Sequence, residues 1–155
     1  MDKKEYRQYA MQAANGDAKA FSKLYQLVYR DMYYTAFYTL KNDEEAIAAI
    51  TETARDGFGA IANLHNEQQF RVYMMRTLCA RMKAFYKRYS DNSLDENQPE
   101  IKTELFELPN VERMIFAMNV AGKFSCEEIA LFAGMTKIGV RKKLARAMQK
   151  LGIEE

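Results

Sequence analysis

SCEEIALFAGMTKIGVRKKLARAMQKL, residues 125–151, is the stretch that decides the fold. It predicts a helix, a tight turn and a second helix. Ala130 is small where two helices would cross, and Gly134 can adopt the positive φ that a sharp turn requires. One apolar stripe would anchor the second helix to the first, and it consists of Val140, Leu144, Ala147 and Leu151. The spacing is that of a helix-turn-helix.

The second of these helices is strongly basic. Between Thr136 and Leu151 the chain carries no acid, and its basic residues are Lys137, Arg141, Lys142, Lys143, Arg146 and Lys150. A helix held on one side and basic elsewhere suits the major groove of DNA. A solvated basic helix at the end of a chain is the alternative. Spacing, turn and charge together favour nucleic acid.

Composition and charge predict two helical modules. At 155 residues the chain can form one domain or two small ones. Two prolines, seven glycines and long 3.6-residue periods favour an all-α protein. Residues 1–89 and 108–155 are each net basic, whereas residues 90–107 are acidic. This alternation predicts two basic modules joined by an acidic, flexible linker.

Five helices are predicted ahead of residue 125. They cover residues 5–15, residues 17–40 as one continuous helix, a stretch that starts at residues 42–43, residues 68–88 and residues 110–120. Gly57 and Gly59 would each weaken the third helix by about 1 kcal/mol relative to alanine. Ser125 and Glu128 have the spacing of a capping box.

The helix over residues 68–88 is the second basic element. It contains six basic residues and no acid, and Arg76, Lys83 and Lys87 share one face. Tyr73 and Tyr86 flank that face, and aromatic rings beside cations suit single-stranded bases and phosphates. A solvated basic face with the tyrosines packed in the core explains the same pattern.

The order of these parts resembles a sigma-70-type initiation factor of the extracytoplasmic-function group. The resemblance covers residues 13–89 and 103–152. It rests on GDAKAFSKLYQLVYRDMYYTAFYTLKNDEEA (residues 16–46), on FRVYMMRTLCARMKAFYKR (residues 70–88) and on the stretch from the Leu108-Pro109 opening to Leu151. It implies a four-helix sigma-2-like domain over residues 1–89, a linker over residues 90–102 and a sigma-4-like helix-turn-helix domain over residues 103–155.

By this resemblance the protein would bind core RNA polymerase and recognise the minus-10 and minus-35 promoter elements. The residues implied at the minus-35 element are Thr136, Lys137, Arg141, Lys142 and Arg146. Those implied near the minus-10 element are Arg71, Arg76, Lys83 and Lys87. The loop over residues 64–67 would lie where the family captures a flipped-out base, and the acidic linker would follow the RNA exit path. A separate anti-sigma factor is a further implied partner.

The polymerase-binding helix departs from the family pattern. It reads AIAAITETARDGF over residues 46–58, with Ala48 and Thr51 where Asp and Gln are typical. Glu52, Ile50 and Phe58 form the predicted polymerase-binding set. Two alternatives therefore stay open. One is a sigma-like regulator with weakened polymerase binding or promoter melting, and the other is a protein-interaction module that uses its basic helices.

No pattern indicates catalysis. His65 lies in a polar loop, and no phosphate-binding loop, nucleophile motif or metal-ligand cluster is present in the sequence. We therefore expect no enzymatic activity, no cofactor and no metal. Cys79 and Cys126 lack the spacing of a zinc site and read as reduced thiols. Without a signal peptide or a membrane-spanning run, the expected location is the cytoplasm.

Overall fold

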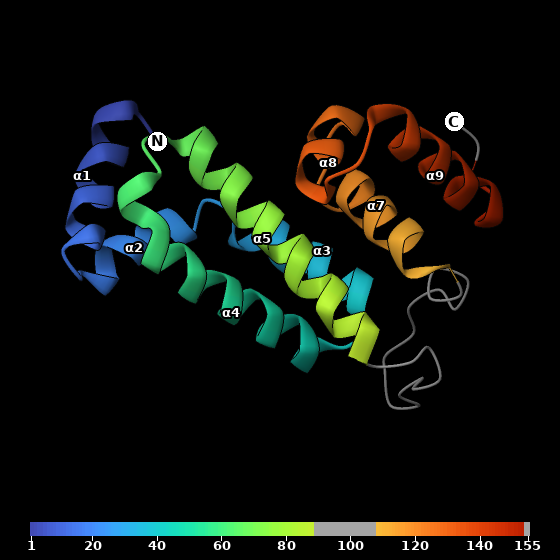
Figure 1. Cartoon of the computed structure of the whole chain (residues 1–155), viewed down its shortest axis with the longest axis horizontal. Helices are drawn as coiled ribbons and strands as arrows, with labels where there is room; N and C mark the ends of the chain where they lie inside the picture. Colours follow the sequence, from blue (N-terminus) through green and yellow to red (C-terminus); the bar gives the residue numbers. More distant parts are fainter. Residues whose placement is uncertain (89–107, 154–155) are drawn as a thin grey trace.

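The computed structural model describes residues 1–88 and 108–153 (Figure 1). All regular secondary structure in these residues is helical, which confirms the predicted all-α class. The elements are α1 (Lys3–Ala14), α2 (Ala18–Tyr25), α3 (Tyr29–Leu40), α4 (Asp43–Ala60), the short 3₁₀ helix η1 (Ile61–Asn63), α5 (Glu67–Arg88), α7 (Asn110–Val120), α8 (Cys126–Ala133) and α9 (Lys137–Lys150). The predicted linker over residues 90–102 lies outside the described residues.

Side-chain caps fix the starts of the early helices. Asp17 accepts hydrogen bonds from the backbone N–H groups of Lys19 and Ala20 at the start of α2. Asn42 accepts a bond of 3.0 Å from the N–H of Glu45 at the start of α4. Each cap satisfies a backbone donor that the first helical turn leaves without a partner. Both starts agree with the sequence-based prediction.

The prediction of one continuous helix from residue 17 to residue 40 is wrong. The chain leaves α2 after Tyr25 and re-enters a helix, α3, at Tyr29. In between, the N–H groups of Leu27 and Val28 bond to carbonyls only three residues back, as in a tighter turn. The apolar period continues through this break without a glycine or a proline, so the sequence pattern does not reveal it.

The N-terminal core forms where α4 and α5 pack against each other and against α3 (Figure 1), while the Phe21 ring of α2 contacts aromatic rings of both α4 and α5. Leu24, Met32, Phe70 and Met74 are fully buried there. Gly57 of α4 faces α5, and a Cβ atom at this position would lie 2.5 Å from the Met74 sulfur. The absence of a side chain therefore permits the close approach of the two helices, which offsets the expected helical cost of this glycine.

Two of the three C-terminal helices reach the N-terminal segment, because α7 packs against α3 and α8 packs against α5 (Figure 1). Helix α9 packs on α7 and α8, and one apolar cluster runs through both segments. The Cys79 sulfur of α5 lies 3.8 Å from the Met118 sulfur of α7. Arg113 of α7 is 2% exposed, and its Nε donates a 2.6 Å bond to the carbonyl of Thr39. The two segments are therefore in direct contact, and the chain runs between them through residues outside the described part.

Candidate nucleic-acid interface

Helices α8 and α9 form the predicted helix-turn-helix. Ser125 and Glu128 close a capping box at the start of α8, which confirms that prediction. Gly134 ends α8 in the left-handed region with a φ of 69°, the conformation that favours glycine. Thr136 then caps α9, and its hydroxyl oxygen accepts a 3.0 Å bond from the N–H of Gly139. Local sequence signals thus fix both ends of the turn.

Helix α9 has one buried face and one open basic face. Val140, Leu144 and Ala147 are buried against α7 and α8, as predicted. Arg141, Lys142 and Arg146 are exposed on the other side, and none of them forms an ion pair among the described residues. This leaves a surface of three cations, which we call the α9 basic face. It has the geometry and charge to contact DNA phosphates or base edges.

Lys137 is placed differently from these three. Its Nζ lies 2.6 Å from Glu127 Oε1, so it joins the first turn of α9 to the first turn of α8. The hydrogen bond from Lys137 lowers the pKa of the Glu127 carboxyl. Both side chains lie at the surface, so DNA phosphate could compete for Lys137. In this structure Lys137 and Thr136 hold the helix start in place.

The predicted basic residues of α5 do not form one open face. Arg71 lies 3.9 Å from Asp31 and 3.7 Å from Glu67. The Nζ of Lys83 donates a 2.8 Å bond to the carbonyl of Ala133, at the end of α8. Arg76 is exposed and lines a groove. Lys87 belongs to α5, and its side chain lies outside the described part of the structure.

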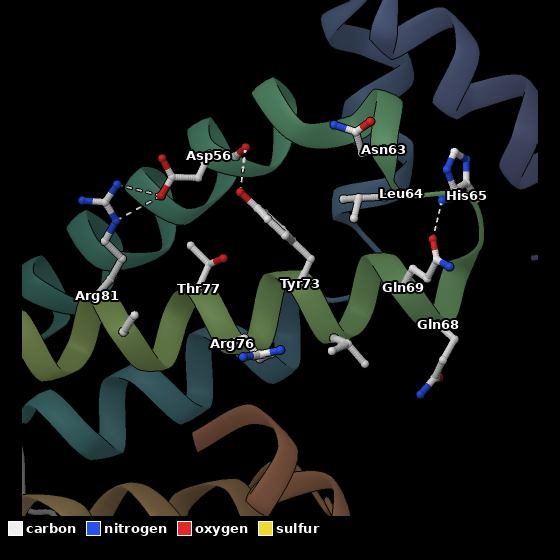
Figure 2. Close-up of a pocket in the computed structure, with 12 residues that line it drawn as sticks. Asp56, Asn63, Leu64, His65, Gln68, Gln69, Tyr73, Arg76, Thr77 and Arg81 are labelled. Carbon is white, nitrogen blue, oxygen red and sulfur yellow. Dashed lines mark hydrogen bonds and ion pairs between the residues drawn. The ribbon is translucent and has the colours of Figure 1, made fainter. Parts of the chain in front are cut away.

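The groove beside Arg76 has a volume of about 840 Å³ and lies between α5, α4 and the loop that precedes α5 (Figure 2). Figure 2 shows Tyr73 reaching from α5 to α4, where its hydroxyl donates a 3.2 Å bond to the carbonyl of Asp56. Leu64, His65 and Gln69 line the loop end, and the His65 N–H bonds to Gln69 Oε1 at 2.8 Å. The groove therefore offers an aromatic ring, amide groups and a cation.

The loop that begins at Leu64 is anchored by a residue for which the sequence predicts no role. The hydroxyl of Tyr6, in α1, donates a 2.7 Å bond to the carbonyl of Leu64. Tyr6 is 1% exposed, and its burial raises the pKa of its phenol to about 12. Because the two residues are 58 positions apart, no local signal pairs them.

The predicted polymerase-binding residues of α4 occupy three different environments. Ile50 is 2% exposed and packs in the core, so it offers no contact surface in this structure. Glu52 is half-buried and lies 3.4 Å from Arg81. Phe58 meets Phe21 edge to face, with ring centroids 5.3 Å apart. Of the three, Glu52 is placed to present a polar atom to a partner.

Within residues 1–88 and 108–153, no three His, Cys, Asp or Glu side chains gather as a metal site would require. Cys79 and Cys126 are both free thiols. None of the described helices combines the length and apolar character needed to cross a bilayer.

The arrangement of these helices is a sigma-like fold, all-α and in two packed parts. Among solved structures, the chain is similar to CnrH, an extracytoplasmic-function sigma factor, in its complex with the cytosolic domain of CnrY. The TM-score is 0.74 at 20% sequence identity, and the match covers 96% of this chain and 95% of the CnrH chain. This similarity shows the fold. No protein-family model and no curated protein sequence matches the chain.

Proposed function

We propose that the protein is a bacterial sigma factor of the extracytoplasmic-function type, which binds core RNA polymerase and directs it to promoters from the cytoplasm. The observation that carries this proposal is the α9 basic face, presented by a capped helix-turn-helix within a sigma-like fold. An open row of cations opposite a buried anchor is what insertion into a major groove requires.

In this proposal α9 reads the minus-35 element. Arg141, Lys142 and Arg146 contact phosphates or base edges, and Thr136 and Lys137 orient the start of the helix. Contacts to phosphate make the affinity depend strongly on salt, because bound counterions are released from the DNA. Replacing one phosphate-binding cation should lower the slope of log affinity against log salt by about one.

The groove beside α5 is the proposed minus-10 site. Arg76 and Tyr73 line it together with the loop that begins at Leu64. A tyrosine ring, amide groups and an arginine are groups that hold an unstacked base. Arg71 and Lys83 lie outside the groove and are paired elsewhere, Arg71 with Asp31 and Glu67 and Lys83 with the Ala133 carbonyl. In this proposal they contact promoter DNA beside the groove once those partners are displaced, and Lys87 extends the same helix.

Core polymerase is proposed to bind at α4, with Glu52 and Phe58 at the contact. Ile50 then acts from the core by fixing the position of the helix. A variant of this function is a sigma-like DNA-binding regulator with weak polymerase binding. The pairing of Glu52 with Arg81 favours that variant, because polymerase must compete for a carboxylate that already has a partner.

The closed packing of α8 on α5 supports a role for an anti-sigma factor. Lys83 is bound to the end of α8, so promoter DNA reaches Lys83 only after the C-terminal helices move away. The similar chain, CnrH, was solved in complex with the cytosolic domain of another protein, CnrY. A partner that covers both segments would stabilise this closed form and keep the protein inactive.

Two binding measurements test the proposal. The double variant Arg141→Glu/Lys142→Glu should lose duplex binding, whereas Lys3→Glu/Lys4→Glu changes the same charge on α1 and should not. A pull-down from the cytosol should recover the large polymerase subunits. DNA binding without polymerase would favour the regulator. Unchanged DNA binding in the first variant would instead indicate a protein-interaction module.

A further inference from the structure

Ile138 is an apolar side chain on the open side of α9. It is 67% exposed, whereas Val140, two residues later, is fully buried. Single exposed apolar residues are common on protein surfaces, so the meaning of Ile138 depends on what surrounds it. Neither the sequence pattern nor the family resemblance assigns it a role.

The surroundings of Ile138 are cationic. Helical spacing places Arg141 and Lys142, three and four residues later, on the same face as Ile138. Both are exposed, and α9 contains no acid. The buried stripe of Val140 and Ala147 lies on the other side of the helix. Ile138 therefore adjoins the α9 basic face at its N-terminal end, as an exposed apolar side chain beside the cations.

The position of Ile138 is fixed by its neighbours. Thr136 caps the helix through the N–H of Gly139, and Lys137 pairs with Glu127 of α8. A Cβ atom at Gly139 would lie 3.0 Å from the Thr136 hydroxyl oxygen, so the missing side chain leaves room for this cap. The first turn of α9 thus holds Ile138 outward in a defined place beside α8.

The chemistry of the major groove suggests what Ile138 contacts. Base edges there present hydrogen-bond donors and acceptors, together with one apolar group, the 5-methyl group of thymine. An isoleucine would leave donors and acceptors without partners, but it matches a methyl group. We propose that Ile138 contacts the 5-methyl group of a thymine in the duplex that α9 reads, with Arg141 and Lys142 on adjacent phosphates or bases. This inference rests on the proposed function and adds a specificity determinant to it.

The test removes the methyl group alone. The full-length chain is used to select its tightest duplex from a randomised pool, and each thymine of that duplex is then replaced by deoxyuridine, one at a time. Affinities are measured by fluorescence anisotropy for the unmodified chain, for Ile138→Ala and for Met11→Ala. Met11 is a matched control because it is also 67% exposed and lies on α1.

Deoxyuridine at one position should weaken the affinity of the unmodified chain and of Met11→Ala about fourfold. This factor corresponds to the free energy of burying one methyl group. Ile138→Ala should bind both duplexes equally. If no replacement matters, or if Ile138→Ala discriminates as before, the inference is overturned while specific binding still supports the proposed function. If the pool yields no preferred duplex, both are overturned.

Discussion

One hydroxyl group ties the first helix to the loop at the end of the groove. The buried Tyr6 donates a part-buried bond to the carbonyl of Leu64, which is half-buried. Loss of such a bond removes its net contribution to stability and leaves the carbonyl with a weaker partner. If the groove binds a base, α1 contributes by holding the loop in position, although its own residues stay outside the groove.

Tyr6→Phe should lower the free energy of unfolding by about 1–2 kcal/mol, because it removes the bond but keeps the ring. Tyr9→Phe is the control on the same helix, and it should change stability by less than about 0.5 kcal/mol. Urea denaturation followed by circular dichroism measures both. Equal effects of the two substitutions would contradict the role given to the Tyr6 hydroxyl.

Buried and half-buried phenols should also make the fold sensitive to alkali. Burial raises the pKa of Tyr6, Tyr25 and Tyr86 to about 12, from a normal value near 10. The folded state favours the neutral phenol, so its contribution is complete below pH 10 and is lost as the pH rises to 12. Thermal melts between pH 8 and pH 12 should show this loss, and Tyr6→Phe should reduce it. A melting temperature that does not change between pH 8 and pH 12 would contradict this expectation.

At the scale of elements, local signals in the sequence predict helix ends well. The two helix caps next to the turn involve residues only a few positions apart, namely Ser125 with Glu128 and Gly134 at the end of α8. Their spacing in the sequence is therefore sufficient to place the turn. The gap between α2 and α3 is not predictable in this way, because the apolar period continues through it. The hydrogen bond from Lys83 to the Ala133 carbonyl likewise cannot be predicted from the sequence, since it depends on how two distant helices pack.

Two glycines should respond to alanine with opposite signs. Gly134→Ala places a Cβ in the left-handed region and should cost about 1–2 kcal/mol of stability. Gly59→Ala should add about 0.5–1 kcal/mol, since Gly59 is inside α4 and a Cβ there meets no atom within 4 Å. Chemical denaturation compares the two. A lower stability of Gly59→Ala would contradict this prediction, because it would mean that the added Cβ is not accommodated beside α4.

At the scale of the whole molecule, the two helical segments are held together by an apolar cluster and by a buried guanidinium. Arg113 donates to the carbonyls of Thr39 and Leu108 and to the side chain of Asn110. The bond to Thr39 crosses between the segments. Sequence reasoning predicts the two segments from charge and periodicity, but their mutual packing depends on tertiary contacts that no short pattern encodes.

Arg113→Met should loosen this packing, because it keeps much of the side-chain volume and removes the donors. We expect a larger radius of gyration in solution scattering and faster hydrogen exchange at the end of α3. Arg146→Met is the control, since Arg146 is exposed on α9 and forms no ion pair among the described residues. An unchanged radius and exchange rate in Arg113→Met would mean that Arg113 does not hold the segments together.

Transcription in vitro tests the proposed function most directly. Core RNA polymerase is mixed with the full-length chain and with fragmented genomic DNA, and the transcript starts are mapped. We predict defined starts that depend on the chain, that disappear with Arg141→Glu/Lys142→Glu and that persist with Lys3→Glu/Lys4→Glu. Folded protein that directs no specific initiation, or starts that survive the loss of the α9 basic face, would contradict the proposal.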